Sequence, residues 1–351
     1  MCAASTSSRL VRPTEYGLYC EAGDFYIDPW RRVERALVTH AHSDHARPGM
    51  GAYLCAESGS GILRERIGQG ASIEGLAYGR TRQIGGVQVS FHPAGHLLGS
   101  AQVRLEHRGE VWVLTGDYKR QPDVSCEAFE PVPCGTLITE STFGLPIYRW
   151  PSPEDVFAQI NDWWRNNRSE GRTSILFAYA LGKAQRVLCG IDATIGPIGV
   201  HGAVDRILPH YRSAGRPLPE TFRAGRETKD LLRGSGLIVA PGSVRNTTWL
   251  RQFAPYSLAF ASGWMMVRGG RRRMALDKGF VLSDHVDWAG ILQTIAECGA
   301  EQVGVTHGYA EALVRWLKEE KGLEAYEVPT RFTGEPVQAA EDTDATTEVN
   351  E

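Results

Sequence analysis

Short apolar and β-branched runs, separated by glycine-rich turns, dominate the first 140 residues of the chain. Their length and composition are typical of buried strands. The runs lie at residues 17–20, 25–27, 36–39, 87–91, 111–115 and 137–139. The run at 36–39, Ala-Leu-Val-Thr, ends directly at His40. The pattern predicts a series of short strands in this part of the chain.

A helical pattern opens a middle block of different character. Residues 153–166 have helical periodicity, with Ser152 as the N-cap and Pro153 at the first helical position. A strand at 175–180 and a helix from 183 to 189 follow. Strand and helix then alternate to about residue 260, which is typical of an α/β unit with a parallel sheet.

The pattern changes again after a Gly/Arg-rich passage at 269–273. Strands are predicted at 279–282 and 302–306, and helices at 288–298 and 310–320. We therefore expect the middle block to be inserted into an outer domain. The predicted division is 1–145 and 265–335 for the outer domain, 146–264 for the insertion and 336–351 for an acidic, disordered tail.

Composition is that of an ordinary soluble globular protein, with 42% hydrophobic and 23% charged residues among 351. No apolar run approaches the roughly 18–20 residues of a membrane helix, and the N-terminus lacks the apolar core of a secretory signal. Seven cysteines without a Cys-x-x-Cys pair favour reduced thiols in a cytoplasmic protein. They do not resemble zinc ligands, so any metal must be held by histidine and carboxylate.

Charge is distributed unevenly, although the net charge is only −3. The segment 336–351 carries five acidic and no basic residues, whereas 146–264 carries 15 Lys and Arg against 9 Asp and Glu. A basic insertion is what a phosphate-backbone partner requires. A solvated arginine-rich surface explains the same count.

The strongest chemical signal is the segment His40-Ala41-His42-Ser43-Asp44-His45, directly after a predicted strand. Residues i and i+2 of an extended segment point the same way, so His40 and His42 can bind one metal. Asp44 and His45 can reach a second metal nearby. Imidazole and carboxylate suit zinc or a similar divalent ion.

Further ligands must come from other strand ends, because one short segment cannot complete two coordination spheres. His96, Asp117 and His307 each follow an apolar strand pattern and stand beside glycine. Asp28 also follows a strand; it is either an acid that supports a ligand or a turn residue before proline. We expect the three strand-end residues to join the cluster that begins at His40.

These motifs together resemble the metallo-β-lactamase fold and, more narrowly, the β-CASP nucleases. The likeness rests on His-x-His-x-Asp-His, His-Pro-Ala-Gly-His, Thr-Gly-Asp and Thr-His-Gly, at 40–45, 92–96, 115–117 and 306–308. Glu140, in 138–144, and His285, in 282–288, match two further β-CASP motifs, with Asp284 where the family usually has alanine. Residues 181–186 resemble a recurrent segment of the insertion. The subgroup most like this chain is the bacterial ligase-associated DNA exonucleases, also described as mRNA 3′-end processing factors.

The resemblance implies an αββα metallo-β-lactamase sandwich with an inserted α/β β-CASP domain, and an active site in the cleft between them. It also implies two divalent ions, zinc first and manganese as an alternative, that share a water of lowered pKa as nucleophile. The implied ligands are His40, His42 and His96 for one ion, Asp44, His45 and His307 for the other, and Asp117 between them. Asp44 is counted with the catalytic residues, and Glu140 is expected to orient His285, which protonates the leaving oxygen.

Four residues of the insertion are candidates for nucleic-acid contacts. Lys183 and Arg186 suit phosphate, although a solvated helix face also explains them; Ser243 and Arg245 lie at a helix start or a structural turn. The expected function is exonucleolytic cleavage of single-stranded DNA in repair, in association with DNA ligase and helicase. RNA processing by the same chemistry is the alternative, and thioester or lactone hydrolysis a more distant one.

Overall fold

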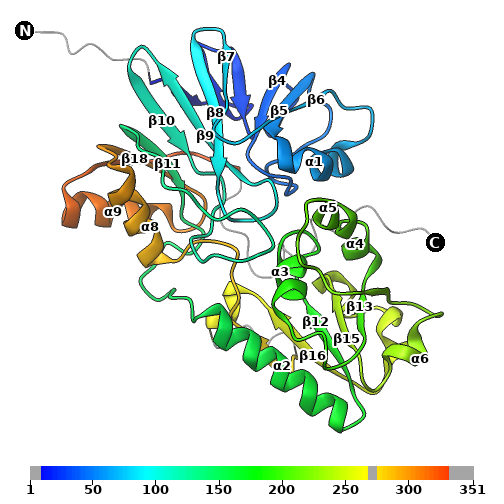
Figure 1. Ribbon diagram of the computed structural model, residues 1–351. Coiled ribbons are helices and arrows are strands. Elements are labelled where there is room, and N and C mark those ends of the chain that lie inside the picture. Colours follow the sequence, from blue (N-terminus) through cyan, green and yellow to red (C-terminus); the bar gives the residue numbers. More distant parts are fainter. Residues whose placement is uncertain (1–8, 268–274, 332–351) are drawn as a thin grey trace, which may run out of the picture.

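The computed structural model describes residues 9–267 and 275–331, which form two lobes (Figure 1). The first lobe contains two sheets. One has the order β1-β2-β3-β4-β5-β6 and the other β19-β18-β11-β10-β9-β8-β7. The strands of the first are β1 (Val11–Pro13), β2 (Leu18–Cys20), β3 (Phe25–Ile27), β4 (Arg35–Val38), β5 (Ala52–Ala56) and β6 (Ile73–Leu76). Those of the second are β7 (Thr81–Ile84), β8 (Val87–Pro93), β9 (Ala101–His107), β10 (Glu110–Leu114), β11 (Thr136–Glu140), β18 (Gln302–Thr306) and β19 (Glu324–Glu327).

Alternation along the strands builds the layers of this lobe. In β4, Leu37 belongs to the core between the two sheets, whereas Ala36 and Val38 pack on the opposite face toward α1 (Ser60–Ile67). In β11, Ile138 belongs to the core between the sheets. Its neighbour Leu137 packs with α8 (Trp288–Cys298) and α9 (Ala310–Lys321). Each sheet is therefore covered by helix on its outer face, which gives the expected αββα sandwich.

The second lobe is built on a parallel sheet of order β14-β13-β15-β12-β16-β17. Its strands are β12 (Thr173–Phe177), β13 (Ile198–Val200), β14 (Phe222–Arg223), β15 (Leu237–Ala240), β16 (Tyr256–Ala261) and β17 (Lys278–Phe280). One face is covered by α2 (Pro153–Ser169), α3 (Lys183–Gly190), α4 (Gly202–Asp205) and α5 (Leu208–Ser213), and the other by α6 (Lys229–Leu232) and η3 (Thr248–Phe253). The predicted N-cap is present, because the Ser152 hydroxyl accepts a hydrogen bond from the amide of Asp155.

The predicted end of the insertion at residue 264 is too early. Strand β17 pairs in parallel with β16, in the sheet of the second lobe. A short apolar strand has the same sequence pattern whichever sheet it joins. The pattern therefore could not predict that β17 pairs with β16. The chain returns to the first lobe after Phe280, through the segment that contains Asp284 and His285.

The parallel strands of the second lobe direct their carboxyl ends toward the first lobe. The loop after β12 reaches it through Leu181, whose carbonyl oxygen contacts His42. The loop after β16 reaches it at Gly263, whose backbone packs against the ring of Phe143. The two lie so close that a Cβ added to Gly263 would be 2.7 Å from the ring. The loops that follow β12 and β16 thus form part of the contact between the two lobes.

Several elements of the first lobe were not predicted, namely α1 and strands β1, β5, β6, β7, β9 and β19. The six cysteines in the described residues are free thiols. Within those residues, no helix combines the length and the apolar character needed to cross a bilayer. The acidic segment 336–351 and the arginines at 271–273 lie outside the described residues.

Candidate metal centre and active site

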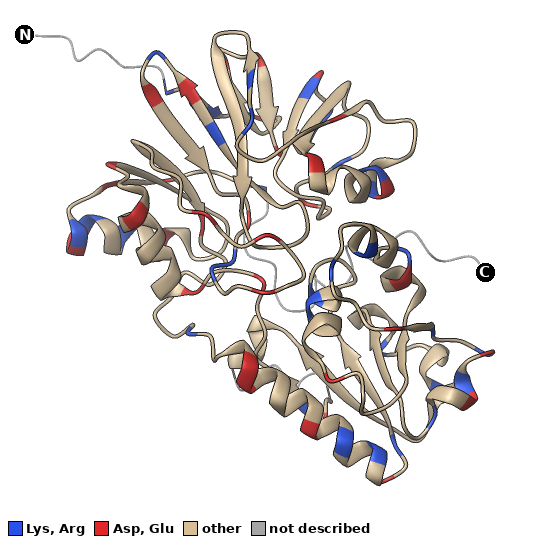
Figure 2. Ribbon diagram, viewed as in Figure 1, with Lys and Arg blue, Asp and Glu red and all other residues tan. Residues whose placement is uncertain are grey.

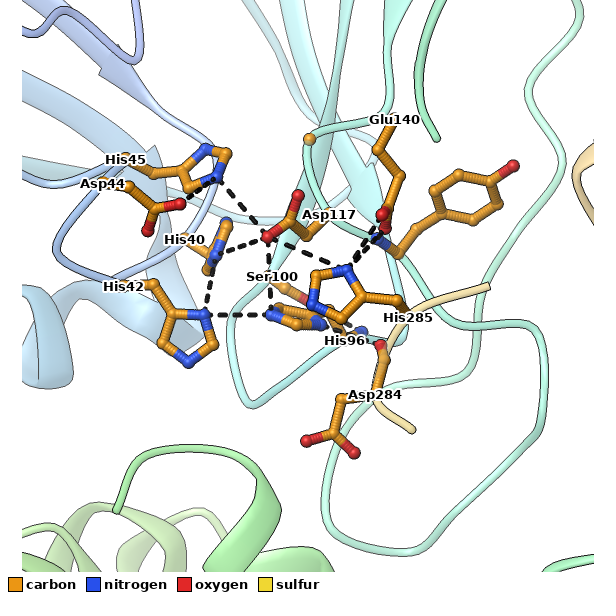
Figure 3. Close-up of polar contacts among 12 residues, drawn as sticks. His40, His42, Asp44, His45, His96, Ser100, Asp117, Glu140, Asp284 and His285 are labelled. Carbon is orange, nitrogen blue, oxygen red and sulfur yellow. Dashed lines mark hydrogen bonds and ion pairs between the residues drawn. The ribbon is translucent and has the colours of Figure 1, made fainter. Parts of the chain in front are cut away.

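Five strand ends bring the predicted chemical residues to one place. His40 follows β4, Asp117 follows β10, Glu140 ends β11 and His307 follows β18, while His96 lies in the loop between β8 and β9. Strands β10, β11 and β18 are parallel neighbours, so their carboxyl ends meet at one edge of the sheet. Figure 3 shows most of these side chains converging around Asp117.

Three imidazoles and one carboxylate form the first group of candidate ligands. The Nδ1 atom of His42 lies 3.1 Å from the Nε2 atom of His40 and 3.1 Å from that of His96. The carboxylate oxygen Oδ2 of Asp117 lies 3.5 Å from His40 Nε2. Two ligands at a tetrahedral angle on zinc, with Zn–N near 2.0–2.1 Å, are separated by about 3.3 Å. The spacing of these nitrogens therefore fits a shared divalent ion.

Asp44, His45 and Asp117 form the second group. The Nε2 atom of His45 lies 3.5 Å from Asp44 Oδ2 and 3.4 Å from Asp117 Oδ2. This nitrogen is buried and has no hydrogen-bond partner among the described residues, which is costly unless another group binds it. Asp117 belongs to both groups through the same oxygen, Oδ2, so one carboxylate is within reach of the ligand atoms of either group.

His307 lies beside the second group rather than within it. Its ring stacks on that of His45, with centroids 5.5 Å apart, and both residues line a cavity with Asp44. The ligand atoms that lie within 4.8 Å of one another do not include a nitrogen of His307. Its role as a ligand of the second ion is therefore a proposal that the position of its ring supports.

The electrostatics of the site favour neutral imidazole at His40 and His96. Burial, together with the neighbouring histidines, holds the pKa of His40 and that of His96 well below the ordinary histidine value. A neutral ring is the form that binds metal. Burial also opposes charge on His45, but Asp44, Asp117 and Asp28 outweigh it and raise its pKa well above the ordinary value.

The outer nitrogens of the ligand histidines are fixed by other groups. Asp28 Oδ2 accepts a hydrogen bond of 2.7 Å from His45 Nδ1, and Asp28 is itself held by the amide and hydroxyl of Thr39 at 2.8 and 2.6 Å. His42 Nε2 donates to Leu181 O at 3.1 Å, and His96 Nδ1 donates to a main-chain carbonyl at 2.8 Å. Such partners fix the tautomer and the ring orientation of a ligand. Of the two interpretations of Asp28, the geometry supports the acid that orients a ligand.

A separate acid–histidine pair lies next to the metal groups. His285 Nδ1 lies 2.9 Å from one carboxylate oxygen of Glu140 and 3.0 Å from the other. Burial opposes charge on His285, but Glu140 and Asp117 raise its pKa to about 9. His285 Nδ1 lies 4.0 Å from Asp117 Oδ2, so the acid–histidine pair is adjacent to both groups of candidate ligands.

Comparisons of the sequence with known proteins identify several relatives. The chain is 30% identical over 320 residues to the Probable DNA ligase of Opitutus terrae, covering 89% of this chain and 30% of that protein. It is 26% identical over 283 residues to Ribonuclease TTHA0252 of Thermus thermophilus, covering 70% of this chain and 64% of that one. It is 34% identical over 123 residues to Endoribonuclease ysh-1 of Neurospora crassa, covering 34% and 14%. The chain belongs to the metallo-β-lactamase-fold β-CASP nuclease family.

The chain thus spans less than two thirds of each of these relatives. A solved structure of a protein of unknown function from Enterococcus faecalis V583 shares the fold, with a TM-score of 0.60 and 12% identity, over 85% of this chain and 80% of that one. No family model matches the chain.

The interpretation of Lys183 and Arg186 as residues of a solvated face of a β-CASP helix is wrong. They are 3% and 1% exposed, and both bind the carboxylate of Asp284. Ser243 and Arg245 lie at the short helix η2 (Gly242–Val244), which follows β15. Lysines and arginines of the inserted lobe are spread over several of its elements (Figure 2). Direct phosphate contact by these four residues remains a prediction, and the burial of the first two does not favour it.

Proposed function

We propose that the chain is a metal-dependent phosphodiesterase that hydrolyses single-stranded nucleic acid. The observation that carries the proposal is the sharing of Asp117 by two groups of candidate ligands, with His285 and its partner Glu140 beside them. Two neighbouring divalent ions are the usual means of hydrolysing a phosphodiester by in-line displacement. Ions bound here would stabilise charge on the phosphate oxygens and lower the pKa of a water.

The side chains of the site have two further roles, which are to position the phosphate and to donate a proton. Asp117 and the ligand histidines would fix where a phosphate can sit. Asp117, His40, His45 and His96 are buried, whereas His42 and His307 are half-buried. Glu140 holds His285 through Nδ1, which leaves the Nε2 proton to be given to the leaving oxygen. Proton transfer of this kind contributes typically 10²–10⁴-fold in rate.

We propose DNA as the substrate, cleaved from an end, with zinc as the first metal and manganese as the alternative. The support for DNA is that the relative named as a probable DNA ligase aligns with 89% of the chain, which also supports an association with DNA ligase. The part in repair and the helicase partner are proposed from the subgroup resemblance alone. The loops of the inserted lobe border the site, which favours a single strand over a duplex. RNA is the second candidate, because the relative named as a ribonuclease aligns with 70% of the chain. Free thiols support a cytoplasmic location.

One digestion separates these possibilities. The protein, stripped of metal and reloaded with zinc or manganese, is incubated with a DNA strand, an RNA strand of the same sequence and the DNA duplex, each labelled at either end. We expect stepwise shortening of the DNA strand with the metal-loaded protein alone. Preferential cleavage of RNA would support the RNA alternative. Hydrolysis of a thioester or lactone without cleavage of either strand would overturn the proposal.

A further inference from the structure

Five charged residues are buried where the inserted lobe meets the metal groups. We call them the interface charge cluster: Lys119, Asp123, Lys183, Arg186 and Asp284. The side chains of Asp123 and Asp284 are 7% and 6% exposed, and the three cationic side chains 4% or less. Charged side chains are rarely buried so deeply unless they are paired, because leaving water is costly for an ion. The position of the cluster therefore needs an explanation.

The contacts of the cluster join three separate segments of the chain. Lys183 Nζ lies 3.0 Å from Asp284 Oδ2, and an Arg186 nitrogen lies 3.2 Å from Asp284 Oδ1. The same guanidinium donates to the carbonyl of Ser283 and lies 3.4 Å from Asp123 Oδ2. Asp123 also binds Lys119. Lys183 and Arg186, both on α3, thus hold the segment 283–284 next to the loop that contains Asp123.

Two main-chain carbonyls beside the cluster bind the outer nitrogens of candidate metal ligands. The carbonyl of Asp284 accepts from His96 Nδ1, and the carbonyl of Leu181 accepts from His42 Nε2. The Leu181 loop is itself fixed, because the Gln185 amide group accepts from Gly182 N at 2.7 Å and donates to the carbonyl of Ala180 at 2.9 Å. Two of the three histidines in the first group are therefore oriented from the inserted lobe and its return.

We propose that the interface charge cluster couples the docking of the inserted lobe to metal binding by His42 and His96, with Asp284 and Lys183 as positioning residues. The inference rests on the proposed function, because it takes the two histidines to be metal ligands. A ring held in place by a carbonyl loses little rotational freedom when it binds an ion. Linkage then requires the reverse effect: an ion that orders both rings must also stabilise the docked lobe.

The first test measures metal affinity in variants of the cluster. Zinc Kd is determined by competition with a chromophoric chelator for the wild-type chain and for Asp284→Asn and Lys183→Met. The matched control is Asp192→Asn. This variant removes a carboxylate of the same lobe that lies 2.8 Å from Arg165 and does not contact the metal groups. Loss of a group that orients a ligand typically weakens metal binding by about 10–100-fold. We expect that loss for both cluster variants and unchanged affinity for the control; affinities equal to the control would overturn the proposal.

The second test needs no variant, which matters because buried charges left unpaired can prevent folding. Amide hydrogen exchange of residues 180–190 and 283–286 is measured in the wild-type chain with and without zinc. We expect zinc to slow exchange in both segments, with little change in α6, which lies on the other face of the inserted sheet. Zinc binding without this protection would overturn the coupling and leave the proposed function intact. Failure to bind zinc or manganese at all would instead overturn the proposed function.

Discussion

The imidazole of His285 and the carboxylate of Glu140 lie 2.9 Å apart, although 145 residues separate them in the chain. Glu140 is 1% exposed, and its other oxygen accepts a hydrogen bond from the amide of Tyr118 at 2.8 Å. The carboxylate therefore cannot turn away from the ring without leaving a buried donor unpaired. His285 lies on the segment that returns from the inserted lobe, and its neighbour Val286 donates a hydrogen bond to the carbonyl of Tyr118 at 2.7 Å.

Replacing His285 by alanine is expected to lower kcat by about 10²–10⁴-fold, because the proton donor for the leaving oxygen is lost. The metal content, measured by elemental analysis, should equal that of the wild-type chain. His92→Ala is a suitable control, because His92 contacts Ser90 and Glu130 rather than the metal groups. Full activity of the His285 variant would remove this residue from the proton transfer.

Asp28→Asn tests whether Asp28 supports metal binding by orienting the ring of His45. The amide would present a donor or a weaker acceptor to His45 Nδ1, so the ring would lose its fixed orientation. We expect zinc to bind about 10–100-fold more weakly, as measured by chelator competition. Asp24→Asn is the matched control, because Asp24 also has a positive φ, of 51°, but its side chain is 70% exposed. Equal affinities in the two variants would show that Asp28 is a turn residue only.

Sequence reasoning found the site because ligands at strand ends leave a local signature. His40 and His42 stand two residues apart after an apolar strand, and that spacing alone predicts a shared ion. No comparable signature marks the interface charge cluster. Lys183 and Arg186, three residues apart on a helix, have the spacing of an ordinary solvated face. Only the contact with Asp284, about 100 residues later, shows that this face is buried.

Gly308→Ala tests how the turn after β18 places His307. Gly308 has a φ of 56°, and an added Cβ would lie 2.3 Å from the carbonyl oxygen of Ser141. Left-handed backbone costs a non-glycine residue about 1–2 kcal/mol, and overpacking adds about 1–3 kcal/mol. We therefore expect a loss of about 2–5 kcal/mol in unfolding free energy, measured by urea denaturation.

Gly322→Ala is the control for backbone strain at Gly308. Gly322 has a φ of 63°, with nothing within 4 Å of an added Cβ. Its variant should lose about 1–2 kcal/mol through the left-handed conformation alone. Equal losses in the two variants would show that the structure accommodates the added methyl group beside Ser141 at no cost in unfolding free energy. The contact between Gly308 and Ser141 would then not be what fixes the position of His307.

The interface charge cluster should also make stability depend on pH through Asp123. Burial raises the pKa of Asp123, but Lys119 and Arg186 outweigh burial and hold it below the ordinary value. An acid with a lowered folded pKa contributes stability above its unfolded pKa, near 3.9, and loses it as pH falls through the folded value. Asp123→Asn should therefore unfold at lower urea than the wild-type chain at pH 7. The difference should shrink as pH falls below about 4, because the unfolded wild-type chain then takes up the proton first and the folded carboxyl takes it up only at lower pH. A difference that stays constant between pH 7 and pH 3 would mean that the side chain stabilises the cluster by packing and not by its charge.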